Sequence, residues 1–137
     1  MKLFKDRMSH TQVLGPLELT VMEIMWARGE SNVRDVVEKL ARPLAYTTVM
    51  TTLARLHSKG ALAREPAGRT NMYRLAVEPD ALDAALTARR MTRLLEAGSD
   101  RAAALARFVA ELGPEDEQLL IDLLASHPPT SRPQGRE

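Results

Sequence analysis

The amino-acid sequence predicts a mainly α-helical protein with one small β-hairpin, built from two parts of the chain. Three observations predict this fold class. Apolar residues recur at helical spacing in three short segments before residue 60. Two short strand-like segments around a Gly turn follow between residues 61 and 75. Three further helical segments, separated by Gly and Pro, then occupy residues 78–126.

The composition excludes several classes of protein. A chain of 137 residues with 45% hydrophobic content is one domain, or one small domain with an appendage. The absence of Cys excludes disulfides, thiolate metal sites and Cys nucleophiles, and fits a reducing cytoplasm. There is no Gly-rich phosphate loop, and His10, His57 and His127 lack the spacing of metal ligands. We therefore expect no enzyme, no metal and no cofactor.

The sequence has no membrane-targeting feature. No stretch approaches the roughly 20 apolar residues of a membrane span. Lys2 and Lys5 are not followed by the apolar run of a signal peptide. We therefore expect a cytoplasmic protein that does not insert into a membrane.

Charge is distributed unevenly between the two parts. Residues 1–77 contain 12 Lys/Arg and 7 Asp/Glu, whereas residues 78–137 contain 7 Lys/Arg and 11 Asp/Glu. A basic half joined to an acidic half predicts a polyanionic partner for the first half only.

The first two helical segments carry their own start signals. Pro16 fits the first turn of a helix that ends near residue 28. Asn32 is expected to cap the next helix, with Asp35 in the capping-box position and Pro43 beyond its end. Trp26, the only Trp, is expected to pack in the core or against another domain.

Residues 46–59 form the third expected helix, and its two faces differ. Val49, Leu53 and Leu56 share one apolar face with Tyr46. The other face has no acid and carries hydroxyls, methyls and cations, which are groups that contact phosphates and base edges. The expected groove-facing set is Thr47, Thr48, Thr51 and Arg55, and the wider set of DNA contacts adds Tyr46, Thr52 and Lys59. An ordinary surface helix is the alternative for this segment taken alone.

A basic hairpin is expected directly after the third helix. Its turn lies at residues 66–68, and Arg69 lies at or near the tip, flanked by Arg64 and Arg74. Two short helices joined by a tight turn, followed by a basic wing, predict an N-terminal winged helix-turn-helix over residues 14–77 that binds DNA. Arg64 and Arg69 are expected to contact phosphates or the minor groove. A winged helix used for protein interaction is the alternative.

Residues 14–77 also resemble a known family, the penicillinase-repressor family of bacterial regulators (BlaI/MecI type). The motifs that carry the resemblance are the run Leu17 to Trp26, Val33-Arg34-Asp35-Val36, Ala45-Tyr46-Thr47-Thr48-Val49-Met50 with its continuation to Leu56, Lys59-Gly60, and Met72-Tyr73-Arg74-Leu75. The Ala-Tyr-Thr-Thr-Val-Met run is similar to the actinobacterial branch. The resemblance implies a homodimeric repressor on a palindromic operator, with β-lactam resistance as the family's best-known output.

The three C-terminal helices are expected to form a dimerisation module over residues 78–126. Helices of this length bury little apolar surface on their own, and a two-fold operator requires a two-fold protein. The alternative is that they pack back on the winged helix of one chain. The expected dimer contacts are Leu82, Leu86, Leu94, Leu105, Phe108, Val109, Leu120 and Leu124. Residues 1–13 are expected to be a flexible arm, and residues 127–137 a disordered tail.

The resemblance further implies relief of repression by proteolysis. The family's best-known members are cut just before a Phe in the middle C-terminal helix, which corresponds to the bond Arg107–Phe108. Arg107 stands where those members have Asn. A membrane-bound sensor-protease is the partner that this mechanism implies. Induction by a small effector in the dimer cleft is the alternative.

Overall fold

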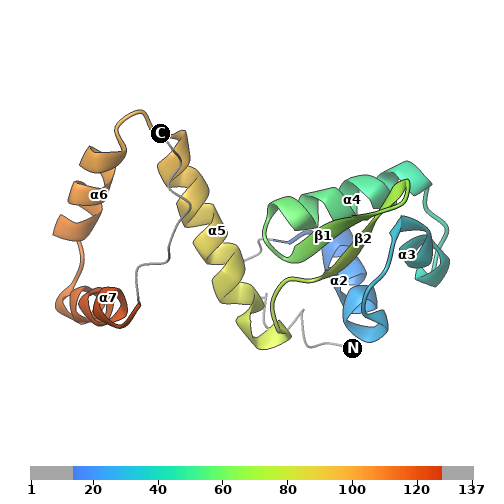
Figure 1. The fold of residues 1–137 in the computed structure, drawn as a ribbon, viewed down its shortest axis with the longest axis horizontal. Coiled ribbons are helices and arrows are strands. Elements are labelled where there is room, and N and C mark those ends of the chain that lie inside the picture. The colour runs from blue at the N-terminus through green and yellow to red at the C-terminus, as the bar shows by residue number, and fades with distance from the viewer. Residues whose placement is uncertain (1–13, 128–137) are drawn as a thin grey trace. The chain divides into compact units, whose positions relative to one another are not determined.

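The computed structural model describes residues 14–127, and it divides the chain into a head unit, Met1–Arg93, and a C-terminal unit, Leu94–Glu137 (Figure 1). The expected arm at residues 1–13 and the tail from residue 128 on lie outside the described residues. The elements in chain order are α2 (Pro16–Arg28), α3 (Val33–Lys39), α4 (Tyr46–Ser58), β1 (Leu62–Ala67), β2 (Thr70–Leu75), the 3₁₀ turn η1 (Pro79–Ala81), α5 (Leu82–Ala97), α6 (Arg101–Ala110) and α7 (Pro114–Ser126). This order confirms the predicted fold class, mainly helical with one hairpin.

The predicted start signals of the short helices are present. Oδ1 of Asn32 accepts a hydrogen bond from the backbone N–H of Asp35 at 2.8 Å, and Oδ2 of Asp35 accepts one from the N–H of Asn32 at 3.0 Å. This reciprocal capping box starts α3. Oδ1 of Asp100 accepts a hydrogen bond from the N–H of Ala103 and serves as a simple N-cap of α6.

The core of the head unit lies between α2, α3, α4 and the hairpin. Tyr73 of β2 is 2% exposed and reaches into this core. Its backbone exchanges two hydrogen bonds with Ser31, which forms an isolated bridge on the loop between α2 and α3. The hairpin is therefore held to the helices by backbone pairing as well as by packing. Trp26 was expected in the core or against another domain; it is 36% exposed, so it is not a core residue of the head unit, and packing against another domain remains a prediction.

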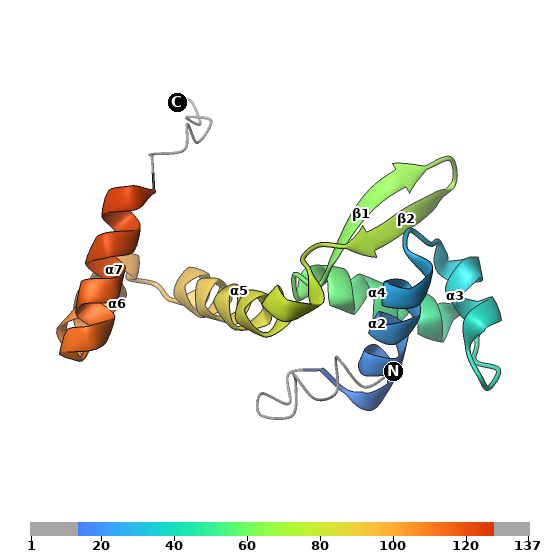
Figure 2. The ribbon, with the colours of Figure 1, turned by 90° about the horizontal axis from the view of Figure 1, so that it is seen from below.

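The hairpin is antiparallel, and it pairs Leu62 with Leu75 at one end and Ala67 with Thr70 at the other. The turn is therefore Gly68-Arg69, two residues long and slightly later than the predicted turn at residues 66–68. Gly68 has φ +68°, a conformation that Gly adopts without steric cost. Figure 2 shows this ribbon projecting from the helices.

The beginning of α5 belongs to the head unit. Leu82 is 1% exposed and Leu86 is fully buried, and both lie in the same core cluster as the α4 residues. The structure therefore places them in the core of one chain and not on a surface that meets a second chain, which corrects their expected role as dimer contacts. The head also extends to Arg93, beyond the boundary predicted at residue 77.

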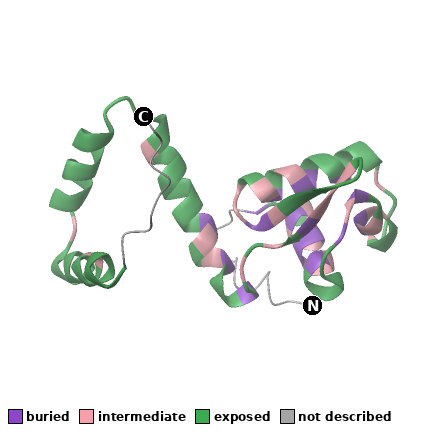
Figure 3. Cartoon of the chain, viewed as in Figure 1, coloured by how far each residue is buried: buried purple, intermediate pink, exposed green. Residues whose placement is uncertain are grey.

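The C-terminal unit has no comparable core within its described residues, 94–127. No residue of α6 or α7 is buried, and Figure 3 shows both helices almost entirely in the colour of exposed residues. Its exposed large apolar residues are Leu94, Leu105, Phe108, Val109, Leu119, Ile121, Leu123 and Leu124. An isolated chain leaves this apolar surface in water, which costs free energy that burial recovers.

Candidate nucleic-acid interface

Helix α4 has one buried face and one exposed face, as its sequence pattern predicts. Val49, Leu53 and Leu56 are fully buried in the core. On the opposite face Thr47, Thr51 and Arg55 are exposed. No residue from Tyr46 to Ser58 is acidic, so the exposed face carries hydroxyls and a guanidinium without a carboxylate between them.

The expected groove-facing residues lie around one shallow depression. The depression has a volume of about 330 Å³ and is lined by Leu17, Thr47, Thr48, Thr51, Thr52 and Arg55. Leu17 comes from α2, so the start of α2 borders the exposed face of α4. The structure thus brings the four groove-facing candidates together.

Thr52 does not belong to that exposed set. It is 5% exposed, and its hydroxyl donates a hydrogen bond to the backbone carbonyl of Thr48 at 2.8 Å. Its expected role as a DNA contact is corrected, because the hydroxyl is already used inside the helix.

Lys59 is also engaged within the chain. Its Nζ lies 2.8 Å from Oε1 and 3.0 Å from Oε2 of Glu18, which is 9% exposed. This ion pair joins the end of α4 to the first turn of α2, and the expected phosphate contact of Lys59 remains a prediction. Tyr46, which the pattern placed on the apolar face and among the wider set of DNA contacts, is 46% exposed at the start of the helix, and its DNA contact remains a prediction.

The wing presents exposed cations. Arg69 lies in the two-residue turn at the tip, and both Arg69 and Arg64 are exposed. Arg74 lies 3.7 Å from the carboxylate of Glu65 in an exposed pair across the strands. Arg64 and Arg69 therefore remain the candidate wing contacts.

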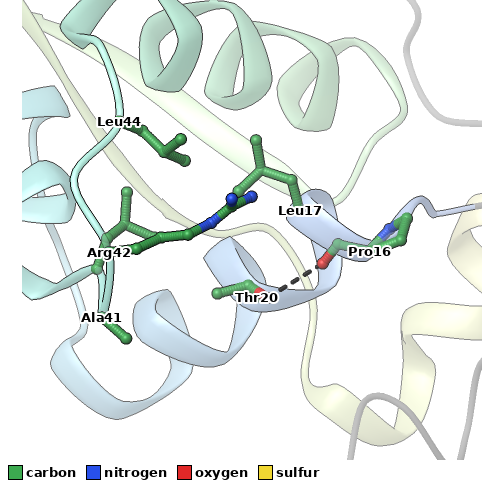
Figure 4. Close-up of a pocket in the computed structure, with 7 residues that line it drawn as sticks. Pro16, Leu17, Thr20, Ala41, Arg42 and Leu44 are labelled. Atoms are coloured by element: carbon green, nitrogen blue, oxygen red, sulfur yellow. Dashed lines mark hydrogen bonds between the residues drawn. The ribbon is translucent and has the colours of Figure 1, made fainter.

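Arg42 is an exposed residue in the loop between α3 and α4 that no sequence pattern singled out. Figure 4 shows its side chain extending from that loop toward Leu17 of α2. The two residues line a hollow of about 320 Å³ together with Pro16, Thr20, Leu40, Ala41 and Leu44. A cation in the turn before a recognition helix is well placed to contact a DNA phosphate. The signal for this role in the sequence was the position of Arg42 in the connection between the two helices.

Met50 is a second residue that the pattern did not single out. It is 43% exposed on α4, three residues after Thr47 and therefore next to it on the helix surface. A thioether at this place adds an apolar group that can pack on a thymine methyl. The signal in the sequence was its helical spacing from Thr47.

The other predicted residues lie in the C-terminal unit or at its start. Phe108 is 47% exposed and its neighbour Arg107 is also exposed, both on α6. Leu94 and Leu124 are 75% and 70% exposed, whereas Leu120 is half-buried. The dimer role of these residues remains a prediction.

His57 is half-buried at the end of α4. Its Nδ1–H donates a hydrogen bond to the carbonyl of Leu62 at 3.0 Å, at the junction of α4 and β1. Within residues 14–127, no group of His, Asp and Glu side chains is arranged to hold a metal ion. No helix in this part of the chain has the length and apolarity needed to cross a membrane.

Three packed helices, a basic hairpin and an acid-free exposed face on the third helix define a winged-helix domain of the DNA-binding class. The chain belongs to the penicillinase repressor family, whose model matches residues 14–126. This match covers both units of the structure.

Individual relatives agree with that assignment. The chain is 39% identical over 115 residues to proteins named transcriptional regulator BlaI from two strains of Mycobacterium tuberculosis, covering 82% of this chain and 83% of each relative. These relatives are named as regulators and not as enzymes, which agrees with the expectation of a non-enzymatic protein.

Among solved structures, the DNA-binding domain of the repressor BlaI is 29% identical, with a TM-score of 0.45 over 48% of this chain and 83% of that chain. The archaeal chromatin protein TrmBL2 is 20% identical, with a TM-score of 0.52 over 97% of this chain and 46% of that chain. The second likeness concerns the fold alone.

Proposed function

We propose that the protein is a dimeric transcriptional repressor that binds palindromic operator DNA in the cytoplasm. The observation that carries this proposal is the exposed, acid-free face of α4, where Thr47, Thr48, Thr51 and Arg55 surround one depression. A helix of 13 residues is about 20 Å long, and a major groove about 12 Å wide admits an α-helix.

The exposed side chains divide into base-reading and phosphate-binding groups. Arg55 and the methyl groups of Thr47 and Thr51 are suited to base edges, because guanidinium forks onto guanine and methyls pack on thymine. Arg64 and Arg69 of the wing, with Arg42 before α4, carry the phosphate contacts that fix the register.

The C-terminal unit supplies the dimer in this proposal. Its helices expose Phe108, Val109 and Leu105 and bury no residue in the single chain. A second copy is the simplest cover for this surface, since a palindromic operator presents two equal half-sites about one helical turn apart. The proposed contacts are Leu94, Leu105, Phe108, Val109, Leu120 and Leu124.

Proteolysis at Arg107–Phe108 is the proposed route of relief, with a membrane-bound sensor-protease as partner. The bond lies within α6, so a cut there divides the proposed dimer surface. Each head alone makes half the phosphate contacts and loses the effective concentration that linkage provides. A small effector remains the second route, because apolar surface binds such molecules without a sequence motif.

Selection of bound sequences from random duplex DNA tests the central proposal. The full chain should enrich a palindrome with two half-sites, and fluorescence anisotropy should then give an affinity at least about 10³-fold above that for random DNA at the same salt. Enrichment of no sequence, with equal affinity for all duplexes, would reject operator recognition and favour a different partner for the winged helix.

A further inference from the structure

A basic hollow lies where α5 passes the end of α4. It has a volume of about 380 Å³, and its lining residues, called here the arginine hollow, are Ser58, Lys59, Leu86, Arg89, Arg90 and Arg93. All six belong to the head unit. The residues proposed to bind the operator groove do not line it.

The hollow arises because one face of α5 changes from apolar to basic along the length of the helix. Leu82 and Leu86 point this face into the core. Arg89, Arg90 and Arg93 follow Leu86 at i+3, i+4 and i+7, so they continue the same face. A buried leucine stripe thus becomes an arginine stripe once the helix leaves the core.

Two of the arginines are held in place by α4. One guanidinium nitrogen of Arg93 donates to the carbonyl of Ser58 at 2.6 Å and to its hydroxyl at 2.7 Å. Arg89 donates to the same carbonyl at 3.3 Å. A carbonyl at the end of a helix carries partial negative charge, so α4 positions these side chains without neutralising them.

No carboxylate in the described part of the chain forms an ion pair with Arg89, Arg90 or Arg93. The fourth cation of the hollow, Lys59, pairs with Glu18, which does not line the hollow. Like charges three and four residues apart on a helix repel each other. The cluster is therefore electrostatically unfavourable until a bound anion offsets the repulsion between the arginines.

We propose that the arginine hollow binds a phosphate group. Guanidinium groups present paired N–H donors that match phosphate oxygens, and three of them converge on one concave site with a serine hydroxyl at its edge. The phosphate comes either from a free phosphate-bearing small molecule or from the backbone of bound DNA. Only binding of the DNA backbone rests on the proposed function.

Calorimetric titration of the DNA-free full chain with inorganic pyrophosphate at low ionic strength tests the site. We expect saturable binding of one pyrophosphate per chain, weakened about tenfold or more by Arg89→Gln/Arg90→Gln. Arg90→Gln alone removes a guanidinium that makes none of the bonds to Ser58, so it should weaken binding without disturbing α4. The matched control is Arg101→Gln, an exposed arginine of α6, which should bind as the unaltered chain does. Absence of saturable binding, or equal binding by the unaltered chain and its three variants, would overturn the proposal.

The two possible sources of the phosphate are distinguished by measuring DNA affinity against salt concentration with the same variants. If the DNA backbone fills the hollow, the double variant should have a shallower salt dependence, by roughly one for each DNA phosphate that the hollow no longer binds. If a free small molecule fills it, the salt dependence should be unchanged while pyrophosphate binding disappears. Failure of every protein to bind any DNA would reject the proposed function and leave the pyrophosphate result standing.

Discussion

The ammonium group of Lys59 lies 2.8 Å from Oε1 of Glu18, joining the C-terminal end of α4 to the first turn of α2. The same Oε1 accepts a hydrogen bond from the backbone N–H of Gly15 at 2.9 Å, which caps α2. One carboxylate therefore serves both as a helix cap and as an ionic link to the proposed recognition helix. The pair therefore joins α2 to the end of α4 just before β1 begins.

Removal of this cation should lower stability without altering contact with phosphates. We expect Lys59→Met to reduce the free energy of unfolding by about 1–2 kcal/mol, because the largely buried Glu18 loses a charged partner. Urea unfolding followed by the fluorescence of Trp26, the only Trp, measures this change. The salt dependence of DNA affinity should stay as it is, and a slope shallower by about one per protomer would show that Lys59 binds phosphate after all.

Lys59 also illustrates what the sequence could not predict. Its position on the polar face of α4 follows from helical periodicity, but Glu18 is 41 residues away and only the fold brings the two together. Leu82 and Leu86 are a similar case, because their spacing indicates a buried face without indicating which surface buries it. Local signals were sufficient elsewhere: the Asn32–Asp35 capping box needs only residues three apart.

Thr51 and Thr52 form a matched pair for testing the recognition face. Thr51 is exposed, whereas Thr52 is buried and bonded to the carbonyl of Thr48. We expect Thr51→Ala to weaken binding to the selected operator by about 1–3 kcal/mol and to leave binding to random DNA unchanged. Thr52→Val should have no effect on either affinity, as measured by fluorescence anisotropy. Loss of operator binding in Thr52→Val, with no loss in Thr51→Ala, would show that the recognition face of α4 has been assigned wrongly.

The wing tip should contribute affinity without sequence preference. Arg69→Ala should weaken binding to operator and random DNA by a similar factor and make the salt slope shallower by roughly 1 per protomer. Arg101→Ala changes charge equally at an exposed site on α6 and serves as the control. A much larger effect on the operator than on random DNA would mean that Arg69 reads sequence in the minor groove.

The C-terminal unit should lose its partner when its apolar surface gains a charge. Phe108→Glu should convert the dimer to a monomer, since a carboxylate without a partner is expensive to bury. Sedimentation velocity at several concentrations measures the change, with Phe108→Leu as an apolar control. An intact dimer in the Glu variant would place the interface elsewhere.

Leu86→Ala separates the core of the head from the dimer surface. Because Leu86 is fully buried among head residues, its truncation should lower the free energy of unfolding by about 2–5 kcal/mol. The folded fraction should still sediment as a dimer. Dissociation of that folded fraction would restore Leu86 to the dimer interface that its sequence spacing first indicated.

Much of the candidate site could be predicted from one segment of the sequence. The rest depends on residues that only the folded chain brings together. The acid-free face of α4 was predictable because all its residues lie within 13 positions of one helix. Arg42 was missed because no periodic pattern marks a loop residue, and its approach to Leu17 appears only in the folded chain. The arginine hollow depends in the same way on α5 passing the end of α4.

Genome-wide footprinting of the full chain on its own chromosome, at a stated salt concentration, tests the central claim most directly. Recognition of operators by a two-fold dimer predicts a small number of strongly protected palindromic sites, each absent in the Thr51→Ala variant. Weak occupancy spread along the chromosome, unchanged by that variant, would contradict sequence-specific repression through α4.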